Sequence, residues 1–250
     1  MGNTSDRSRV KAVETTLDIV QHLHQAGSAT IDEVAEGVGV GTSTAHRHLT
    51  TLHERGYLVR DGNEYELSLR FLTHGGRQRE TLPANELIHR KVRQLSEETS
   101  ERVQFITEEH GKRVYIFTHA GPDAVKTDAA VGKCGPLHVS AAGKAILANL
   151  PADRYDEILD GVAAPETAER QSLDEELETT RDRGYAFNDE ESTSGLRAVG
   201  VPIRHSDDTV LGAISVSGPA NRLRGEYFRE ELPNLLLGTV NEIELNIEYL

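Results

Sequence analysis

The residue pair best suited to covalent chemistry is Cys134 with His138. A thiol four positions from an imidazole could act as a nucleophile with a nearby base, as in a small hydrolase. The surrounding sequence offers no third residue to orient the base, and inert buried cysteines are common. We therefore expect no enzyme activity and keep the hydrolase as a distant alternative.

Two glycine-rich segments contain the residue types of phosphate-binding loops. Residues 37–41 alternate glycine and valine, but they follow a predicted helix instead of a strand, and Thr42 stands where the dinucleotide motif needs a third glycine. Gly143-Lys144 resembles the end of a P-loop, but His138 and Ala145 replace the other required residues of that motif. We interpret the first segment as a turn between two helices, and we expect no nucleotide cofactor.

Three histidines on one predicted helix, His46, His48 and His53, are candidate metal ligands. Only His46 and His53 share a face, and no cysteine or acid completes a tetrahedral set. We therefore expect no metal site.

Charge and apolar content limit the class of protein. The 250 residues include 41 acids and 27 Lys or Arg, a net charge of −14 that would repel DNA at low salt. Residues 1–80 hold nine of the bases and eleven acids, so they carry −2 and the remaining 170 residues carry −12. No segment approaches the roughly 20 apolar residues of a membrane helix, the N-terminus lacks a signal core, and one cysteine cannot form an intrachain disulfide. We expect a cytoplasmic protein with no membrane partner.

The first part of the chain has the pattern of three helices and a hairpin. Apolar residues recur at intervals of three and four within residues 10–25, and Thr30 with Glu33 predicts a capping box that begins a second helix. Thr42 or Ser43 can cap a third helix, and two alternating segments then meet at residues 61–63. This order predicts a winged helix-turn-helix, in which the third helix enters the major groove of DNA.

The polar face of the third helix has the composition of a DNA-binding surface. No acid occurs between Glu36 and Glu54, although acids are abundant elsewhere, and Thr42 to Arg60 carries a net +2. A helix whose only role is solvation would be expected to carry some acids. The candidate DNA-binding residues are Thr42, Ser43, Thr44, Arg47, Thr50, Thr51 and Arg60.

The second part of the chain predicts an α+β domain. A helix at 85–100 precedes candidate strands at 102–109 and 112–120, and a third candidate at 123–130 completes a β-meander. Further helices are expected at 153–159 and 172–183, and a strand pair turns at 206–208. A helix from 225 to 250 ends the chain, so we expect a mixed sheet covered by helices.

The segment "GPLHVSAAGKAILANL" predicts a loop followed by a short helix. Ser140 could cap that helix, and the backbone N–H groups of Ser140, Ala141 and Ala142 could then face an anion. The alternative, in which Ser140 caps its own helix and nothing binds there, is the more common arrangement. His138 could orient a carboxylate, but a single histidine in a turn is more often structural.

Four segments resemble the IclR family of transcription regulators, and together they extend over nearly the whole chain. They are "TSTAHRHLTTLHERGYL", "GPLHVSAAGKAILA", "RGYAFNDEESTSGLRAVGVPI" and "GAISVSGPANRL". The acidic composition is most similar to the haloarchaeal branch. The resemblance implies an N-terminal winged helix that dimerises and a C-terminal GAF-like domain that binds a small effector. Carried onto this sequence, it implies effector contacts from Leu137, His138, Ser140, Ala141, Asn188, Ala198, Ser215 and Ser217.

Three residues depart from the usual pattern of the family. Asn188 stands where the family often has Asp, Ala198 where it often has Cys, and Val139 where it often has Cys. Each change removes a charge or a thiol, so the effector cannot be transferred from a relative. The neutral polar contacts lead us to expect a small organic acid, such as a sugar acid or another intermediate of carbon metabolism.

The sequence therefore predicts three parts: a winged helix-turn-helix at 1–69, a linker helix at 70–83 and an effector domain at 84–250. The expected partners are a double-stranded DNA operator, a small organic effector and further copies of the chain in a homodimer or tetramer. The apolar stripe of the first helix and Leu235, Leu236, Leu237 and Val240 motivate the oligomer. The nearest alternative is a ligand-sensing protein-interaction module that does not bind DNA.

Overall fold

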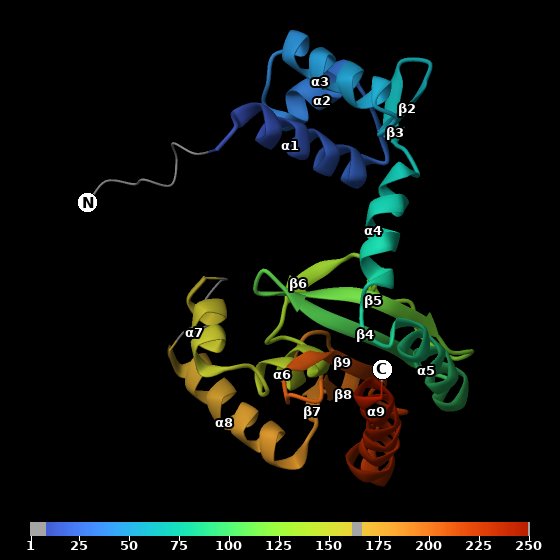
Figure 1. Ribbon diagram of the computed structural model, residues 1–250, viewed down its shortest axis with the longest axis vertical. Helices are drawn as coiled ribbons and strands as arrows, with labels where there is room; N and C mark the ends of the chain where they lie inside the picture. The colour runs from blue at the N-terminus through green and yellow to red at the C-terminus, as the bar shows by residue number, and fades with distance from the viewer. Residues whose placement is uncertain (1–8, 162–166, 250) are drawn as a thin grey trace. The chain divides into compact units, whose positions relative to one another are not determined.

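The computed structural model describes residues 9–161 and 167–249. Contacts within the chain divide it into two compact units, Met1–Glu80 and Thr81–Leu250. Figure 1 colours the first unit blue to cyan and the second green to red. The predicted linker segment contains helix α4, Arg70–Glu80, which belongs to the first unit.

The first unit is a winged helix-turn-helix, as predicted. A three-stranded sheet with the order β1-β3-β2 packs against three helices. Strands β2 and β3 pair in antiparallel register from Leu58↔Leu67 to Asp61↔Glu64, so the hairpin turns at the predicted residues. Strand β1 was not predicted. The elements are α1 (Lys11–Ala26), β1 (Ser28–Thr30), α2 (Ile31–Val38), α3 (Thr42–Glu54), β2 (Leu58–Asp61) and β3 (Glu64–Leu67).

The glycine-rich segment is only partly a turn, which corrects the prediction. Gly37 lies inside α2, where an added Cβ would be 2.2 Å from the ring of His22, so a larger residue would require the His22 side chain on α1 to move. Gly39 has a left-handed φ of 72° and ends α2. Gly41 is the N-cap of α3, and no side chain caps that helix. Thr42 and Ser43 are therefore helical residues and not its cap.

The second unit is built on one six-stranded sheet with the order β6-β5-β4-β9-β8-β7. All of its pairings among the described residues are antiparallel, so the prediction of a mixed sheet was wrong. The strands are β4 (Arg102–Glu109), β5 (Lys112–Ala120), β6 (Cys134–Pro136), β7 (Ala186–Asp189), β8 (Leu196–Arg204) and β9 (Val210–Pro219). The helices are α5 (Asn85–Thr99), α6 (Ala141–Leu147), α7 (Ala152–Gly161), α8 (Thr167–Arg183) and α9 (Leu232–Glu248), which follows a π-helical turn, Tyr227–Glu231.

The third strand of the predicted meander was also misplaced. Residues 123–130 form turns and irregular backbone, and the strand that pairs with β5 is β6, where Lys112 faces Pro136 and Val114 faces Cys134. The segment between β5 and β6 is therefore a long connection. It contributes side chains to the pocket described below.

The two faces of the sheet follow from alternation along its strands. Val199, Val201 and Ile203 of β8 join one core with α5 and α9, as do Ile214 and Val216 of β9. Ala213 of β9 faces the opposite core, which α6, α7 and α8 cover. Figure 1 shows α5 and α9 apart from the group α6, α7 and α8.

Helix α9 uses its apolar side chains inside its own unit. Leu236 is fully buried, Val240 is 3% exposed, and both belong to the core formed with α5. Leu235 and Leu237 are partly buried and pack against the same core. These residues therefore give no argument for an oligomer, contrary to the sequence-based expectation. Among the described residues, no helix is long and apolar enough to cross a membrane.

Candidate functional site

Helix α3 presents an exposed polar face in the first unit. Ala45 and Leu49 are fully buried and fix the orientation of the helix on the core. The opposite positions, Thr42, Ser43, Thr44, Arg47 and Thr51, are exposed, whereas Thr50 is half-buried. The structure thus presents six of the seven predicted DNA-binding residues to solvent, with Arg60 on the wing as the sixth.

Arg47 and Arg60 differ in how firmly they are held. Arg47 has no carboxylate partner within 4.0 Å among the described residues, so its guanidinium is available to a ligand. Arg60 donates from Nε to the carbonyl of Gly62 at 2.9 Å and lies 5.4 Å from the ring centroid of Tyr65. It is therefore positioned by the hairpin that carries it.

The histidines of α3 have structural contacts. A ring nitrogen of His48 lies 2.8 Å from the hydroxyl of Thr16, which joins α3 to α1. His53 contacts the carbonyl of Leu58 at 3.1 Å and packs edge-on against Tyr65. No group of three potential metal ligands occurs in the part of the chain that the structure describes.

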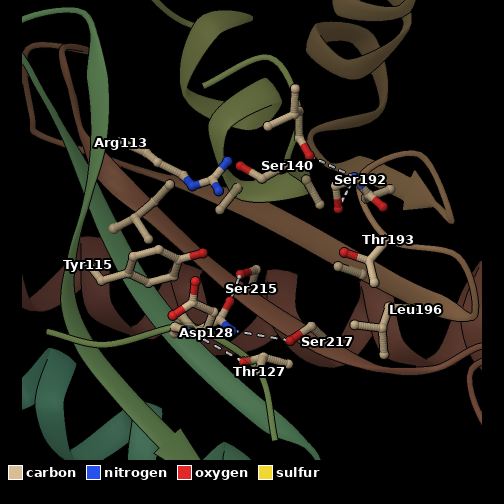
Figure 2. Close-up of a pocket in the computed structure, with 18 of the residues that line it drawn as sticks. Arg113, Tyr115, Thr127, Asp128, Ser140, Ser192, Thr193, Leu196, Ser215 and Ser217 are labelled. Atoms are coloured by element: carbon tan, nitrogen blue, oxygen red, sulfur yellow. Dashed lines mark hydrogen bonds between the residues drawn. The ribbon is translucent and has the colours of Figure 1, made fainter. Parts of the chain in front are cut away.

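The second unit contains a cavity of about 500 Å³, within the range of about 300 to 1,000 Å³ for small-molecule sites. It opens on the sheet face that carries Ala198, Ser215 and Ser217, because these residues alternate with the buried core residues of β8 and β9. Figure 2 shows Tyr115, Ser215 and Ser217 among the residues that line this cavity.

Six of the eight predicted effector residues line this cavity. Ser140, Ala141, Asn188, Ala198, Ser215 and Ser217 are among its lining residues. The other two lie elsewhere: Leu137 is 1% exposed in the core beside α6, and Leu137 and His138 border a separate, smaller cleft. The prediction for Leu137 and His138 is corrected accordingly, because in this segment the cavity lining begins at Val139 and these two residues border the smaller cleft instead.

Hydrogen bonds hold the neutral polar groups of the cavity in place. Gln104 accepts from the hydroxyl of Ser215 at 3.1 Å and donates to the hydroxyl oxygen of Ser217 at 3.2 Å. The proton of the Ser217 hydroxyl therefore remains available to a ligand. Asn188 is 3% exposed and donates from Nδ2 to the carbonyl of Val139 at 3.0 Å. It links strand β7 to the turn before α6.

Ser140 caps helix α6 by accepting from the backbone N–H of Gly143 at 3.1 Å. Its own N–H donates to the carbonyl of Leu137 at 3.2 Å, so it is not the free anion donor that the sequence suggested. Gly143 has a packing role, because an added Cβ would be 2.0 Å from the same carbonyl of Leu137. This contact explains the glycine that resembles a P-loop.

A fully buried lysine lies on the same helix. Lys144 Nζ donates at 2.6 Å to Glu176 of α8 and at 2.6 Å to Glu191, which lines the cavity. Glu191 also accepts the backbone N–H of Asp189 at 3.0 Å. Replacing Lys144 would remove the charge that both glutamates share, so this cluster fixes the loop between β7 and β8 (residues 190–195, the acidic loop) over the cavity.

Two family models together match most of the chain. The model described as "IclR helix-turn-helix domain" matches residues 12–62, and "Bacterial transcriptional regulator IclR C-terminal" matches residues 80–245. The chain belongs to the IclR family of transcriptional regulators.

Individual relatives agree with this assignment. The HTH-type transcriptional regulator Rv1719 of Mycobacterium tuberculosis is 32% identical over 85% of this chain and 82% of its own. A Halobacterium salinarum protein named "Probable HTH-type transcriptional regulator ArcR" is 29% identical over 98% of this chain and 97% of its own. The crystal structure of the Thermotoga maritima IclR superposes with a TM-score of 0.76 at 28% identity and covers 96% of this chain and 98% of that one.

In this IclR-family chain, sequence analysis missed several residues of the cavity. Gln104 and Ile106 of β4, and Arg113 and Tyr115 of β5, line it from the opposite half of the sheet, while Thr193 lines it from the acidic loop. Alternation within residues 102–109 and 112–120 could have placed the strand residues on one face. None of the family motifs lies in these two strands.

The two residues of the distant hydrolase alternative lie in different surroundings. Cys134 is exposed in β6 and lines neither the large cavity nor the cleft that His138 borders. Its thiol lies 3.5 Å from the carbonyl oxygen of Gly132. The family assignment points to regulation of transcription as the function.

Proposed function

We propose that this IclR-family regulator binds an operator half-site through α3 and the wing, and that a small organic acid in the cavity controls it. The exposed, acid-free face of α3 carries the DNA-binding part of the proposal. In a winged helix-turn-helix, this helix supplies contacts to base edges and the wing supplies contacts to the backbone. We assign no catalytic role to the chain, and DNA as its target places it in the cytoplasm.

Arg47 at the centre of this face provides the test of DNA binding. If its guanidinium forms a bidentate contact with a base, Arg47→Ala should weaken binding to the operator by about 1 to 3 kcal/mol and leave binding to random DNA nearly unchanged. If it contacts phosphate, both affinities should fall alike and the salt slope should flatten. Gel shifts at several salt concentrations, with the upstream region of the protein's own gene, distinguish these cases.

Arg77→Ala is a suitable control, because Arg77 is an exposed arginine of α4 in the same unit. Like Arg47→Ala, this substitution removes one positive charge, but it leaves the α3 face unchanged. Its effect on DNA affinity therefore measures only the general electrostatic attraction between this unit and DNA. Equal affinity of wild type and Arg47→Ala for both DNAs would remove Arg47 from the interface. Failure of the wild type to bind any DNA would favour the protein-interaction alternative.

The lining of the cavity supports an organic acid as effector. Three lining residues are basic (Arg113, Lys133 and Arg197) and two are acidic (Asp128 and Glu191), so the lining carries a formal charge of 3 − 2 = +1. The remaining polar contacts are neutral hydroxyl and amide groups, which suit a ligand with hydroxyl or carbonyl oxygens. A tightly bound cation would contradict this class of effector.

The oligomer is part of the same proposal and rests on α1. An apolar stripe runs along this helix from its N-cap. It consists of Val10, Val13 and Leu17, whose exposed fractions are 63%, 55% and 61%. Leu69 and Leu72 of the same unit are 81% and 68% exposed. We infer that a second copy of the chain covers the α1 stripe in a homodimer or tetramer. The relative from Halobacterium and the −14 charge support a haloarchaeal origin.

A further inference from the structure

We infer that Arg113 binds the carboxylate of the effector and that the effector is a monocarboxylate. This inference rests on the proposed function, since it names the residue that recognises the acid. Arg113 lies on β5, was absent from the sequence-based site and lines the cavity from the strand opposite α6. Figure 2 shows its guanidinium pointing toward Ser140.

The guanidinium of Arg113 is held in place but is largely unsatisfied. Of its five N–H donors, one on Nη1 donates to the carbonyl of Pro136 at 2.7 Å. Its Nε is buried and has no hydrogen-bond partner. Gly135 leaves the space that the group occupies, because an added Cβ there would be 3.1 Å from Nη2 of Arg113. Buried donors are nearly always paired in folded proteins, so the site lacks an acceptor.

Arg113 is also the only charged lining residue without a charged partner among the described residues. Lys133 pairs with Asp128. Arg197 donates to Asp189 at 2.5 Å, and Glu191 pairs with Lys144 at 2.6 Å. No carboxylate lies within 4.0 Å of Arg113 in the described chain. The positive charge of Arg113 is therefore not paired with a carboxylate of the described chain, so a ligand carboxylate can pair with it.

The rest of the cavity suits an effector whose remaining part, apart from the carboxylate, is neutral and rich in oxygen atoms. Tyr115, Thr193 and Ser217 present hydroxyl groups, and none of them carries a charge. A guanidinium binds a carboxylate through two parallel N–H···O bonds, which fixes the orientation of the ligand as well as its charge. A hydroxy or keto monocarboxylate would then place its oxygens near these hydroxyls. A second carboxylate would meet the paired acids Asp128 and Glu191.

Calorimetry on the full chain with matched probes tests the assignment. The monocarboxylates are gluconate, pyruvate and 4-hydroxybenzoate, the ligand named for a solved IclR homologue from Microbacterium hydrocarbonoxydans. Sorbitol, hydroxyacetone and 4-hydroxybenzamide are the neutral counterparts, and succinate is the dicarboxylate. We expect at least one monocarboxylate to bind about tenfold or more tightly than its counterpart and than succinate. Arg113→Gln should abolish this preference, and Arg113→Lys should restore only part of it because it lacks the planar fork.

Arg102→Gln is the matched control. Arg102 lies on the neighbouring strand β4, donates from Nη2 to the carbonyl of Val125 at 3.1 Å and also has a buried Nε without a partner, but it does not line the cavity. Arg102→Gln should bind the monocarboxylate more tightly than its neutral counterpart and than succinate, as the wild type does. The circular dichroism spectrum and the thermal unfolding midpoint of effector-free Arg113→Gln should equal those of the wild type, which shows that the variant is folded.

The outcomes separate the two proposals. If an acid binds Arg113→Gln as tightly as wild type, the assignment of Arg113 is overturned and an organic-acid effector stands. If neutral probes bind wild type as well as the acids do, or if no acid binds at millimolar concentration, the acid class falls and the Arg113 assignment falls with it. Neither result affects the DNA-binding test on Arg47.

Discussion

Asn188 contributes a neutral side chain with a hydrogen-bond donor to the lining of the cavity. Its Nδ2 group donates to the carbonyl of Val139 at 3.0 Å and lies 3.4 Å from the hydroxyl of Ser192. An aspartate of the same size would place a carboxylate oxygen against a carbonyl oxygen. The change would therefore remove a donor and add a negative charge to the site of an anionic ligand.

We predict that Asn188→Asp weakens binding of an acidic effector at neutral pH and that the loss shrinks as the pH falls. Protonation of the new carboxyl removes its charge and gives it an O–H that can donate to Val139. Calorimetry at about pH 7.5 and about pH 5.5, with wild type measured at both values as the control, checks this linkage. Wild-type affinity in Asn188→Asp at both pH values would contradict it.

At individual residues, the family resemblance implied the serines and Asn188 of the cavity but not Arg113. Ser215 and Ser217 lie in one of the segments that carry the resemblance, and they alternate with apolar residues of one strand. Arg113 lies in none of these segments. Its role depends on β6 and the connection after β5, whose pairing is long-range and has no local signature.

At the scale of elements, the start of α2 and the long strands were predictable, whereas the cap of α3 and the three-residue strands were not. The capping box of α2 and the bounds of β4 and β5 follow from local patterns, and the structure has them where expected. β1 and β6 are each too short to show an alternation, and they exist because a neighbouring strand offers free backbone groups. The strand predicted at 123–130 had a suitable pattern but no such partner.

The capping box gives a prediction about pH. Glu33 accepts from the backbone N–H of Thr30 at 2.8 Å and from its hydroxyl at 2.7 Å, and these bonds hold the pKa of Glu33 below its ordinary value. The stabilisation is therefore present at neutral pH and is lost as the pH falls through the lowered pKa of the folded state. Glu33→Gln should be less stable than wild type at about pH 7, and the difference should narrow toward about pH 3.

Thermal unfolding of the full chain at a series of pH values measures this difference. Glu36→Gln serves as the control, because it removes a carboxylate from the same helix without changing the cap. A constant difference between wild type and Glu33→Gln across the series would mean that the carboxylate charge of Glu33 does not stabilise α2.

At the scale of the whole molecule, the net charge of the chain and the acid-free face of α3 have opposite effects on DNA binding. The −14 charge repels DNA, but only −2 of it belongs to residues 1–80, and the α3 face contains no acid. Salt screens the repulsion from the remaining residues beyond a Debye length of about 8 Å at physiological ionic strength. The affinity for the operator should therefore fall less steeply with rising salt concentration than the number of basic residues alone would suggest.

The apolar α1 stripe leads to the last prediction, which concerns the assembly. Leu17 is 61% exposed, so Leu17→Glu should leave the fold of the chain intact but place a charge in the proposed interface. We expect light scattering to give a dimer or tetramer for wild type and a smaller species for Leu17→Glu.

Operator binding should weaken in parallel, because two half-sites on a pseudo-palindrome need two linked copies of α3. Leu245→Glu is the matched control, since Leu245 on α9 is 57% exposed and lies in the other unit. A monomeric wild type at micromolar concentration, in both low and high salt, would refute the assembly. If Leu17→Glu forms the same oligomer as the wild type, the interface does not include the α1 stripe. An interface that buried Leu17 would not accommodate a carboxylate without a partner, which costs several kcal/mol.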